Sequence, residues 1–475
     1  MINDREQFLK DLSEIVAFNS VEADRSAADA PFGTQVRGAL DWFLNKASYY
    51  GLKVGENHGY YGYAEYGEPE KPLIGILAHA DIVPAGTGWT SDPFTVRRDG
   101  DVIYGRGVAD DKGPLVAMLY VLKKLRDEKA NLRHRVRLIV GCNEETGSLC
   151  LKKYANEGEI PVVSLVPDSD FPVINSEKGI LHTDVIVAPD EAFSANVVSL
   201  EAGTRANVVP GEASVTLKAG SEACEKLRAL TANFDRDDVF STPEIAENLV
   251  RIGAKPADFT VTVMSNGDVT VTAKGVAGHA MAPEKSDNAL WKIWATLEAI
   301  IPASDVAKRV FDNLCRHDAA KVIGAYREDN ETGALTMNMG VAEYEGDSLT
   351  LKFDFRLPIS ANPDETEAAL KSVFGEYGVI KRARFADNLY MPEDSPLIRT
   401  LLSVYSEVTG KKNPRPIQTG GGTYARELPS AVAYGPTEED EVTDLHNADE
   451  HISLDSLDKL FDVYVKAIEK LDAMY

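Results

Sequence analysis

The chain has few cysteines, and their spacing fits neither a zinc knuckle nor a disulfide framework. Only four occur in 475 residues, at Cys142, Cys150, Cys224 and Cys315. A structural zinc site built from thiolates needs closely spaced pairs, and a small disulfide-stabilised secreted domain is much richer in cysteine. We therefore expect free thiols and a reducing, cytoplasmic location.

The sequence also lacks long apolar runs and an excess of basic residues. No stretch approaches the roughly 18 apolar residues that cross a bilayer, and the charged segment 1–7 has no apolar core of a signal peptide. Fifty Lys and Arg stand against 75 Asp and Glu, which gives a net charge of −25. Because such a surface repels nucleic acids and anionic membranes, we expect neither as a partner.

The length and the pattern of elements predict two domains. A chain of 475 residues is too long for one compact core. Strands alternate with helices over residues 1–183, which is typical of an α/β domain whose mostly parallel sheet is covered by helices. Hairpins and helices over residues 184–382 indicate an α+β domain, and the α/β pattern returns over residues 383–475. The sequence thus predicts one α/β domain interrupted by an inserted α+β domain.

Local signals predict several element boundaries. Asp4 with Gln7 resembles a capping box at the start of a helix, and Ser453 is placed to cap the last helix. The pair Asn266-Gly267 between two alternating segments predicts a hairpin with a two-residue turn.

Acidic residues, with one histidine, follow predicted strands or turns at four separate places. In an open α/β sheet, ligands gather where strand ends meet the crevice. Oxygen and nitrogen ligands without a thiolate suit zinc or manganese in a catalytic role. The four places are His79-Ala80-Asp81, Asp110-Asp111 within the segment 105–113, Glu144-Glu145, and Asp168.

Each place taken alone has an ordinary structural explanation. His79 can be a satisfied core residue, and Asp110 or Asp111 can cap a helix. Asp81 can orient His79 if the chain turns at Ala80, as the end of a strand allows. Two adjacent glutamates can lie in a solvated loop, or one can bind metal while the other takes a proton from water. Four such places together favour a metal site.

The motifs that carry these residues resemble those of one family. HAD, GRGVADDKG, NEETGS, VPDSDFP and the late segment 446–450 are similar to the motifs of the di-zinc aminoacylase/carboxypeptidase superfamily of metallopeptidases. Within it, GWTSDPF at 88–94, GGGTYAR at 420–426 and the size of the insert resemble the bacterial dipeptidase V group. The resemblance covers nearly the whole chain. It implies a dipeptidase with two divalent metal ions, Zn²⁺ first and Mn²⁺ or Co²⁺ as alternatives, acting on small peptides.

The resemblance also implies a role for each matched residue of the α/β domain. Two metals would share one carboxylate, and a neighbouring glutamate would act as general base. A further aspartate would orient the first histidine, and the Asp110–Asp111 peptide would be cis. The implied metal ligands are His79, Asp110, Glu145, Asp168 and His446, with Asp110 as the bridge, Glu144 as the base and Asp81 as the orienting residue.

By the same resemblance, the insert is a lid over the substrate. His279 would stabilise the oxyanion, while Asn207 and Arg356 would contact the substrate carboxylate, for which the arginine fork is suited. A glycine turn would close over the substrate's C-terminal end, and it consists of Gly421, Gly422 and Thr423. Without the resemblance, His279 reads as a loop histidine and Arg356 as a surface charge. An insert of about 200 residues implies a monomer, because dimeric relatives have shorter inserts and borrow the histidine.

Two other functions remain open at this stage. The catalytic motifs do not separate a dipeptidase from another amide hydrolase of the superfamily, such as an N-acyl-amino-acid deacylase. A metal-binding protein that has lost catalysis would lack a ligand or the base, and the chain has them all. The remaining histidines match no motif, and they are His58, His134, His182, His317 and His451.

Overall fold

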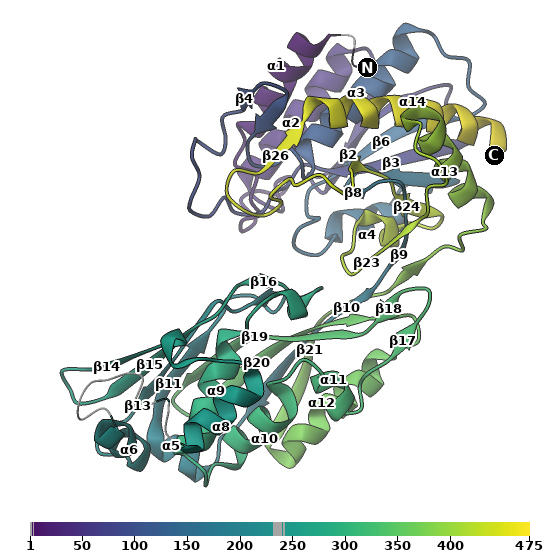
Figure 1. Ribbon diagram of the computed structural model, residues 1–475. Helices are drawn as coiled ribbons and strands as arrows, with labels where there is room; N and C mark the ends of the chain where they lie inside the picture. The colour runs from purple at the N-terminus through teal and green to yellow at the C-terminus, as the bar shows by residue number, and fades with distance from the viewer. Residues whose placement is uncertain (1, 3, 231–239, 241–242) are drawn as a thin grey trace. The chain divides into compact units, whose positions relative to one another are not determined.

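The chain folds into two compact units, each with its own hydrophobic core. The computed structural model describes residue 2, residues 4–230, residue 240 and residues 243–475 (Figure 1). One unit comprises Met1–Ser176 and Leu389–Tyr475, and we call it the split unit; the other comprises Glu177–Asn388, and we call it the insert. The predicted α/β domain with an inserted α+β domain is confirmed.

The split unit is built on a mixed nine-stranded sheet. Four neighbouring strands at its centre run parallel, whereas the strand pairs that immediately flank them are antiparallel. The prediction of a mostly parallel sheet therefore holds for the centre alone. The strands are, in spatial order, β1 (Lys53–Asn57), β2 (Tyr61–Tyr66), β6 (Arg135–Gly141), β3 (Leu73–His79), β7 (Val163–Val166), β24 (Ala431–Ala433), β9 (Ile174–Glu177) and β22 (Leu389–Tyr390), with β23 (Ile417–Thr419) paired to β9.

Helices cover both faces of this sheet. Gly62 of β2 lies against two leucines of α2, while the preceding Tyr61 packs edge-on to Tyr154 of α4 at 5.0 Å. Adjacent strand residues face opposite sides, so α2 and α4 lie on opposite faces. In Figure 1, α1, α2, α3 and α14 lie above the sheet and α4 below it. The helices are α1 (Arg5–Val16), α2 (Thr34–Tyr49), α3 (Lys112–Asp127), α4 (Leu149–Glu157), α13 (Pro396–Thr409) and α14 (Leu454–Met474).

Short strands outside the nine-stranded sheet pair loop segments of the split unit with one another. A three-stranded sheet joins β4 (Arg97–Asp99), β5 (Val102–Tyr104) and β26 (His451–Ser453), so that the segment before α14 pairs with the segment before the Gly105–Gly113 loop. A parallel pair joins β8 (Ser169–Asp170) and β25 (Pro436–Thr437). The Asp110–Asp111 peptide is cis, as expected.

The insert has an eight-stranded sheet in which every neighbouring pair is antiparallel. In spatial order the strands are β14 (Phe259–Val263), β15 (Val269–Lys274), β13 (Glu212–Leu217), β11 (Val197–Ala202), β19 (Thr336–Glu345), β20 (Ser348–Leu357), β10 (Gly179–Val187) and β21 (Gly378–Ala386). Two short ribbons pair β12 (Val208–Val209) with β16 (Gly278–His279) and β17 (Glu328–Asp329) with β18 (Gly333–Ala334).

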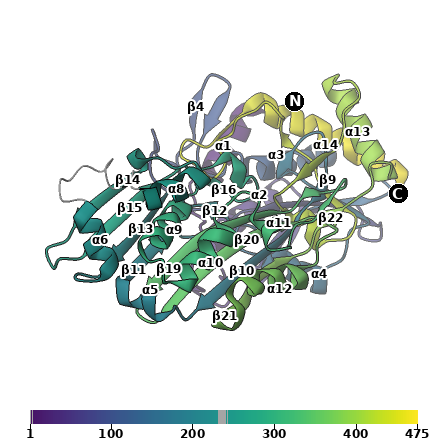
Figure 2. The same ribbon diagram turned by 60° about the horizontal axis from the view of Figure 1, so that its bottom comes forward.

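Helices gather on one face of the insert sheet, as Figure 2 shows for α9, α10 and α12. Apolar side chains of these helices and of the strands form the second core, in which Trp294 of α9 is fully buried beside Phe193. The helices are α5 (Glu191–Asn196), α6 (Glu222–Leu230), α8 (Pro243–Ile252), α9 (Ala289–Ile300), α10 (Asp305–Leu314), α11 (Ala319–Val322) and α12 (Pro363–Phe374).

Several local predictions can be compared with the structure. Asp4 caps α1 by accepting from the Gln7 amide, but the Gln7 side chain donates to Asp11 instead of closing the capping box. Ser453 caps α14 as predicted. The hairpin at Asn266-Gly267 is confirmed, but its two-residue turn is wrong. Met264 N donates to Asp268 O, so the loop has three residues, with Gly267 at φ +94°. Glycine supplies that positive φ in a three-residue loop.

The chain passes between the two units at 176/177 and 388/389. Both boundaries expected from the sequence fall instead within strands β10 and β21, which pair with each other along the insert sheet. Alternation of apolar residues identifies a strand but does not reveal which sheet the strand joins. The pattern therefore cannot predict the residue at which one unit ends and the other begins. Among the described helices, none combines the length and apolar character of a membrane span.

Candidate metal centre

Three parallel neighbours of the split-unit sheet deliver the candidate side chains to one edge. Strand β3 ends at His79 itself, Glu144 and Glu145 follow β6, and Asp168 follows β7. Because β6, β3 and β7 run parallel, their carboxyl ends meet at the same edge. Their fully buried apolar residues explain why the sequence forms central strands here.

Asp110 stands between two histidines from distant parts of the chain. One carboxylate oxygen lies 2.9 Å from His79 Nε2, and the other lies 3.0 Å from His446 Nε2. Each oxygen thus faces one of the two imidazoles. This is the geometry expected of a carboxylate that bridges two cations, each of which would take one oxygen and one imidazole.

Two groups of three side chains could each hold a metal ion. Their ligand atoms lie within 4.8 Å of one another in each group. Asp110, Glu145 and His446 form the group that the sequence predicted for one ion, with His446 Nε2 3.3 Å from a Glu145 oxygen. His79 and Asp168 form the other, with 3.6 Å between Nε2 and Oδ2, but its third member is Glu144. Glu144 therefore stands close enough to be either base or ligand.

Asp81 lies beside His79 but also supports the glutamate loop. His79 Nδ1 is 2.9 Å from the Asp81 main-chain oxygen and 3.5 Å from its carboxylate. The two carboxylate oxygens accept the main-chain amides of Glu144 and Glu145, each at 3.1 Å. A second acid, Glu22, accepts from the side-chain amide of Asn143 at 2.9 Å. The loop after β6 is thus held by acids on both sides.

The metal centre contains more acidic than basic side chains, and it is largely buried. Burial and the nearby carboxylates of Asp110 and Glu145 raise the pKa of Asp168 to about 7, although His79 acts in the opposite direction. Burial and Asp168 also raise the pKa of Glu144, and burial and Asp110 raise that of Glu145. For Asp110 burial acts in the opposite sense, yet hydrogen bonds from His446 and His79 lower its pKa.

The two imidazoles respond to the same field. Burial opposes the charged form of His446, but contacts with Asp110 and Glu145 raise its pKa to about 11. Burial likewise opposes a charge on His79, and its acidic neighbours raise its pKa above the ordinary value. Four carboxylates around two imidazoles attract positive charge.

The residues fit divalent cations by their chemistry and by one orphaned atom. Glu145 Oε1 is buried and has no hydrogen-bond partner among the described residues. A buried carboxylate oxygen without a partner is costly, and a cation would satisfy it. Imidazole nitrogens and carboxylate oxygens without thiolates suit zinc and manganese.

Two of the predicted lid residues, His279 and Asn207, come together within the insert. The register of β12 and β16 pairs Val208 with His279, and Asn207 O accepts the amide of Ala280 at 3.0 Å. His279 is exposed, and its Nδ1 accepts the Met281 amide at 3.1 Å. The ribbon thus presents the histidine beside Asn207.

Arg356 is buried on β20, so the alternative of a surface charge is wrong. Its Nε and Nη2 donate to the two oxygens of Asp354 at 2.7 and 3.0 Å, and His182 contacts the same carboxylate at 2.8 Å. Arg356 pairs in register with Thr336, whose hydroxyl donates to Ala280 O at 3.3 Å. Arg356 and the His279 ribbon therefore belong to one connected part of the insert.

The glycine turn lies in the split unit after β23. Thr423 caps the short 3₁₀ helix Tyr424–Glu427 by accepting the Ala425 amide, and the Gly421 amide donates to Thr419. Gly422 lies beside the Arg426 guanidinium. The next residue, Tyr424, packs edge-on to the His79 ring at 6.1 Å, so the turn is tied to the metal centre.

Sequence reasoning missed several residues that support the centre. Glu22 gave no signal, because it stands in no motif, and Tyr424 belongs to the recognised 420–426 segment but no role followed from its position. A helix cap does not account fully for Asp111, which precedes α3 but whose carboxylate accepts the His79 amide at 2.9 Å. Glu450 belongs to the recognised 446–450 segment, but no role followed from its position.

The other histidines lie outside both ligand groups. His134 pairs with Asp472 at 3.0 Å and His182 with Asp354, while His451 Nδ1 is 2.9 Å from Asp449 O. His317 packs against Trp291, and His58 occupies a turn at φ +46°.

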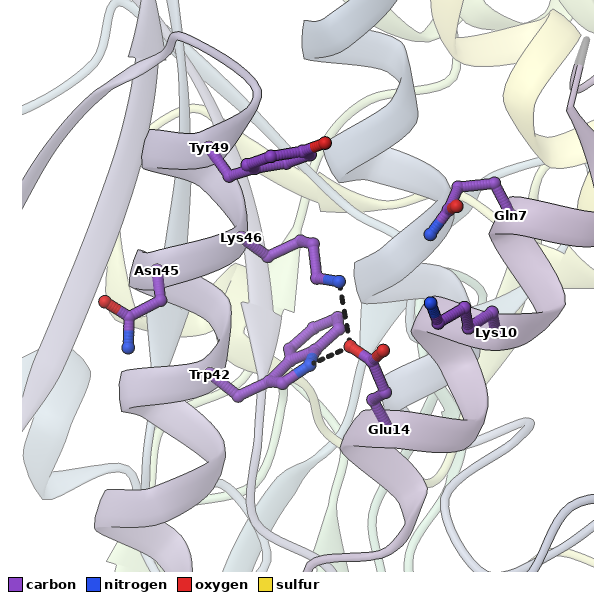
Figure 3. A pocket seen from close by; sticks show the side chains of 7 residues that line it. All are labelled: Gln7, Lys10, Glu14, Trp42, Asn45, Lys46 and Tyr49. Atoms are coloured by element: carbon purple, nitrogen blue, oxygen red, sulfur yellow. Dashed lines mark hydrogen bonds and ion pairs between the residues drawn. The ribbon is translucent and has the colours of Figure 1, made fainter.

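A separate hollow of about 350 Å³ lies between α1 and α2. Figure 3 shows the Trp42 indole and the Lys46 ammonium both directed at Glu14, and these bonds measure 3.0 and 2.8 Å. Lys46 also donates to the buried Asp11. These polar groups already satisfy one another, so the hollow offers no comparable chemistry. Its lining residues are Gln7, Lys10, Glu14, Trp42, Asn45, Lys46 and Tyr49.

Comparisons with known proteins identify full-length relatives and similar folds. The chain is 32% identical over 482 residues to "Putative dipeptidase YtjP" of Bacillus subtilis (strain 168), covering 99% of this chain and 98% of that one. Human carnosine dipeptidase 1 has a similar fold, with a TM-score of 0.57, 15% identity and coverage of 99% and 97%. The M20 family metallo-carboxypeptidase Sso-CP2 of Sulfolobus solfataricus also has a similar fold, with a TM-score of 0.58 and 18% identity. The match covers 99% of this chain and 100% of that chain.

A family model decides the assignment. The model described as peptidase family M20/M25/M40 matches residues 75–470, which include every predicted metal ligand. The recognition of the di-zinc aminoacylase/carboxypeptidase superfamily is confirmed. By both the family model and its full-length relatives, the chain belongs to peptidase family M20/M25/M40.

Proposed function

We propose that the protein is a metal-dependent dipeptidase whose split unit binds two divalent ions. The observation that carries this proposal is Asp110, whose two oxygens face His79 and His446 at 2.9 and 3.0 Å. Asp168 would complete the site of His79, and Glu145 would complete the site of His446. The dipeptidase names of full-length relatives support the substrate class.

Glu144 is the proposed base. When bound, two divalent ions acidify a water molecule and stabilise negative charge on a carbonyl oxygen. Glu144 accepts a proton from the attacking water and delivers it to the leaving nitrogen, as a general base and then a general acid. Asp81 orients this residue by holding the Glu144 amide and also lies against the His79 ring.

The insert is the proposed lid. His279 would donate a hydrogen bond to the developing oxyanion, and Arg356, with Asn207, would bind the free carboxylate of the dipeptide. Gly421, Gly422 and Thr423 would line the same end of the substrate. The pairing of Arg356 with Asp354 supports this role, because a fixed guanidinium loses little freedom on binding.

Three further attributes belong to the proposal. The ligand set favours Zn²⁺, with Mn²⁺ and Co²⁺ as alternatives. The four cysteines are buried and free, which supports a cytoplasmic location. The large insert supports a monomer that uses its own His279, and small peptides are the expected partners.

A substrate panel tests this function. Chelator-stripped protein should be inactive and should regain dipeptide hydrolysis with Zn²⁺, Mn²⁺ or Co²⁺. Dipeptides should be cleaved about 10–100-fold faster than C-terminally amidated dipeptides or tripeptides, because the hydrogen bonds between Arg356 and the free carboxylate, worth about 1.5–3 kcal/mol, would be lost and 1.4 kcal/mol is about tenfold. Preferential turnover of N-acetyl amino acids would instead indicate a deacylase.

Arg356→Met sharpens the panel. It should lower dipeptide kcat/KM and bring the rates for a dipeptide and its amide close together. Arg382→Met is the matched control, since Arg382 lies in the same sheet and pairs with Glu367 at 2.6 Å. Equal rates for a dipeptide and its amide in the wild type would remove the carboxylate role of Arg356.

A mixing experiment tests the monomer. Light scattering at micromolar concentration should give one chain, and a mixture of His279→Ala with Glu144→Gln should stay as inactive as its components. Recovery of activity in the mixture would show that His279 acts across a dimer.

A further inference from the structure

A buried acid outside both ligand groups grips the loop that carries the bridging aspartate. Glu450 is 1% exposed. Its Oε1 accepts the main-chain amides of Gly107, Ala109 and Asp110 at 3.0, 3.0 and 3.2 Å, and its Oε2 accepts from Arg106 Nη1 at 2.6 Å. One side chain thus binds four donors from five consecutive residues.

These contacts fix the backbone on which the Asp110 side chain depends. Gly107 has φ +89°, and a Cβ there would meet Lys112 and Ile82 at 3.0 and 3.1 Å, so the loop follows a path that glycine permits. Three amides aimed at one carboxylate oxygen form a concave anion site in the main chain. With its amide held on this side, Asp110 can project its carboxylate toward both histidines.

The same acid holds the loop that carries His446. Glu450 follows His446 by four residues in a stretch where Asp444, His446 and Asp449 have φ values of +48°, +63° and +58°. Arg106 Nη2 donates to Asn447 O at 3.0 Å, and the Gly105 amide donates to Glu450 O at 3.0 Å. The 105–110 loop and the 446–450 loop are therefore tied together through Glu450 and its arginine.

We infer that Glu450 is a positioning residue of the metal centre, setting the separation between the Asp110 carboxylate and the His446 imidazole. The inference rests on the metal centre of the proposed function. Glu450 itself would bind neither ion nor substrate. Partners behind metal ligands that fix their orientation typically affect metal affinity by about 10–100-fold.

Metal titration of Glu450→Gln tests this role against a merely structural one. Chelator-stripped variant titrated with Zn²⁺ in a calorimeter should bind the ion that needs His446 about 10–100-fold more weakly than the wild type. Glu65→Gln is the matched control, because Glu65 is buried in the same unit and accepts from Arg137 Nε at 2.7 Å and Arg135 Nη1 at 3.2 Å. It should lower the melting temperature and leave both affinities unchanged.

The outcomes separate this inference from the proposed function. A wild type that binds two ions, with a Glu450→Gln variant that binds them equally well, overturns the inference alone. Equal weakening in Glu65→Gln and Glu450→Gln does the same, since it would report general loosening. A wild type that binds no divalent ion overturns the proposed function and the inference with it. Should Glu450→Gln not fold, Glu450→Asp keeps the charge one methylene shorter and is judged by the same comparison.

Discussion

The two histidines of the centre are held in different ways. His79 ends the central strand β3, its side chain is completely buried, and Tyr424 packs against its ring. His446 lies in a loop at φ +63°, and 47% of its side chain is exposed. The first is fixed by a sheet and the second by a few loop contacts. A centre with one rigid and one adaptable half can keep one ion while the other site changes.

The largest expected effect removes the group that both halves share. Asp110→Ala should lose both ions and all measurable hydrolysis, because each half takes one oxygen of this carboxylate. Elemental analysis of the desalted protein measures the ions. Retention of one ion per chain would show that the halves are independent and would remove the bridge.

Glu144→Gln should lower turnover by about 10²–10⁴-fold, because it removes general base catalysis. Both ions should remain, since the amide keeps the shape of the side chain. Glu144 also lies within reach of His79 and Asp168, so this variant decides its role. If elemental analysis shows that the ion bound by His79 and Asp168 is lost, Glu144 is a ligand instead of the base.

The smallest expected effect is the difference between His79→Ala and His446→Ala. Each should weaken the binding of one ion by more than about 100-fold, beyond what a supporting residue costs. His79→Ala should also lower the melting temperature more, because it leaves a cavity in a buried strand end. Calorimetric titration and thermal melting of the stripped proteins provide the two measurements. Equal melting temperatures would contradict the contrast between a strand-held and a loop-held histidine.

Local sequence signals predicted much of the fold because their causes are local. Helices α1 and α14 begin where expected, since Asp4 and Ser453 cap them. The metal-centre residues were found because buried strands rich in apolar residues mark the sheet centre and acidic residues follow them. The family motifs then supplied roles that periodicity alone does not give.

What the sequence did not reveal depends on distant contacts. The Arg106–Glu450 pair joins residues 344 positions apart, and no local pattern marks such a partner. The antiparallel flanks of the sheet were missed because strand direction is set by topology, not by composition. The choice between Glu144 and Glu145 as ligand also depends on loop geometry that two adjacent identical residues do not encode.

The positions at which the insert begins and ends show how it could be added to the chain or removed from it. Where the chain leaves and re-enters the split unit, β9 and β22 are neighbours, and the Met391 amide donates to Asn175 O at 2.8 Å. On the other side, the first and last long strands of the insert pair in register, with Ile180 opposite Ala386. The first and last residues of the insert thus lie next to each other, as the termini of many domains do, and such domains tolerate insertion into another chain. The insert could therefore be replaced by a short linker, or exchanged for another domain at the same two points, without changing the strand order of the split-unit sheet.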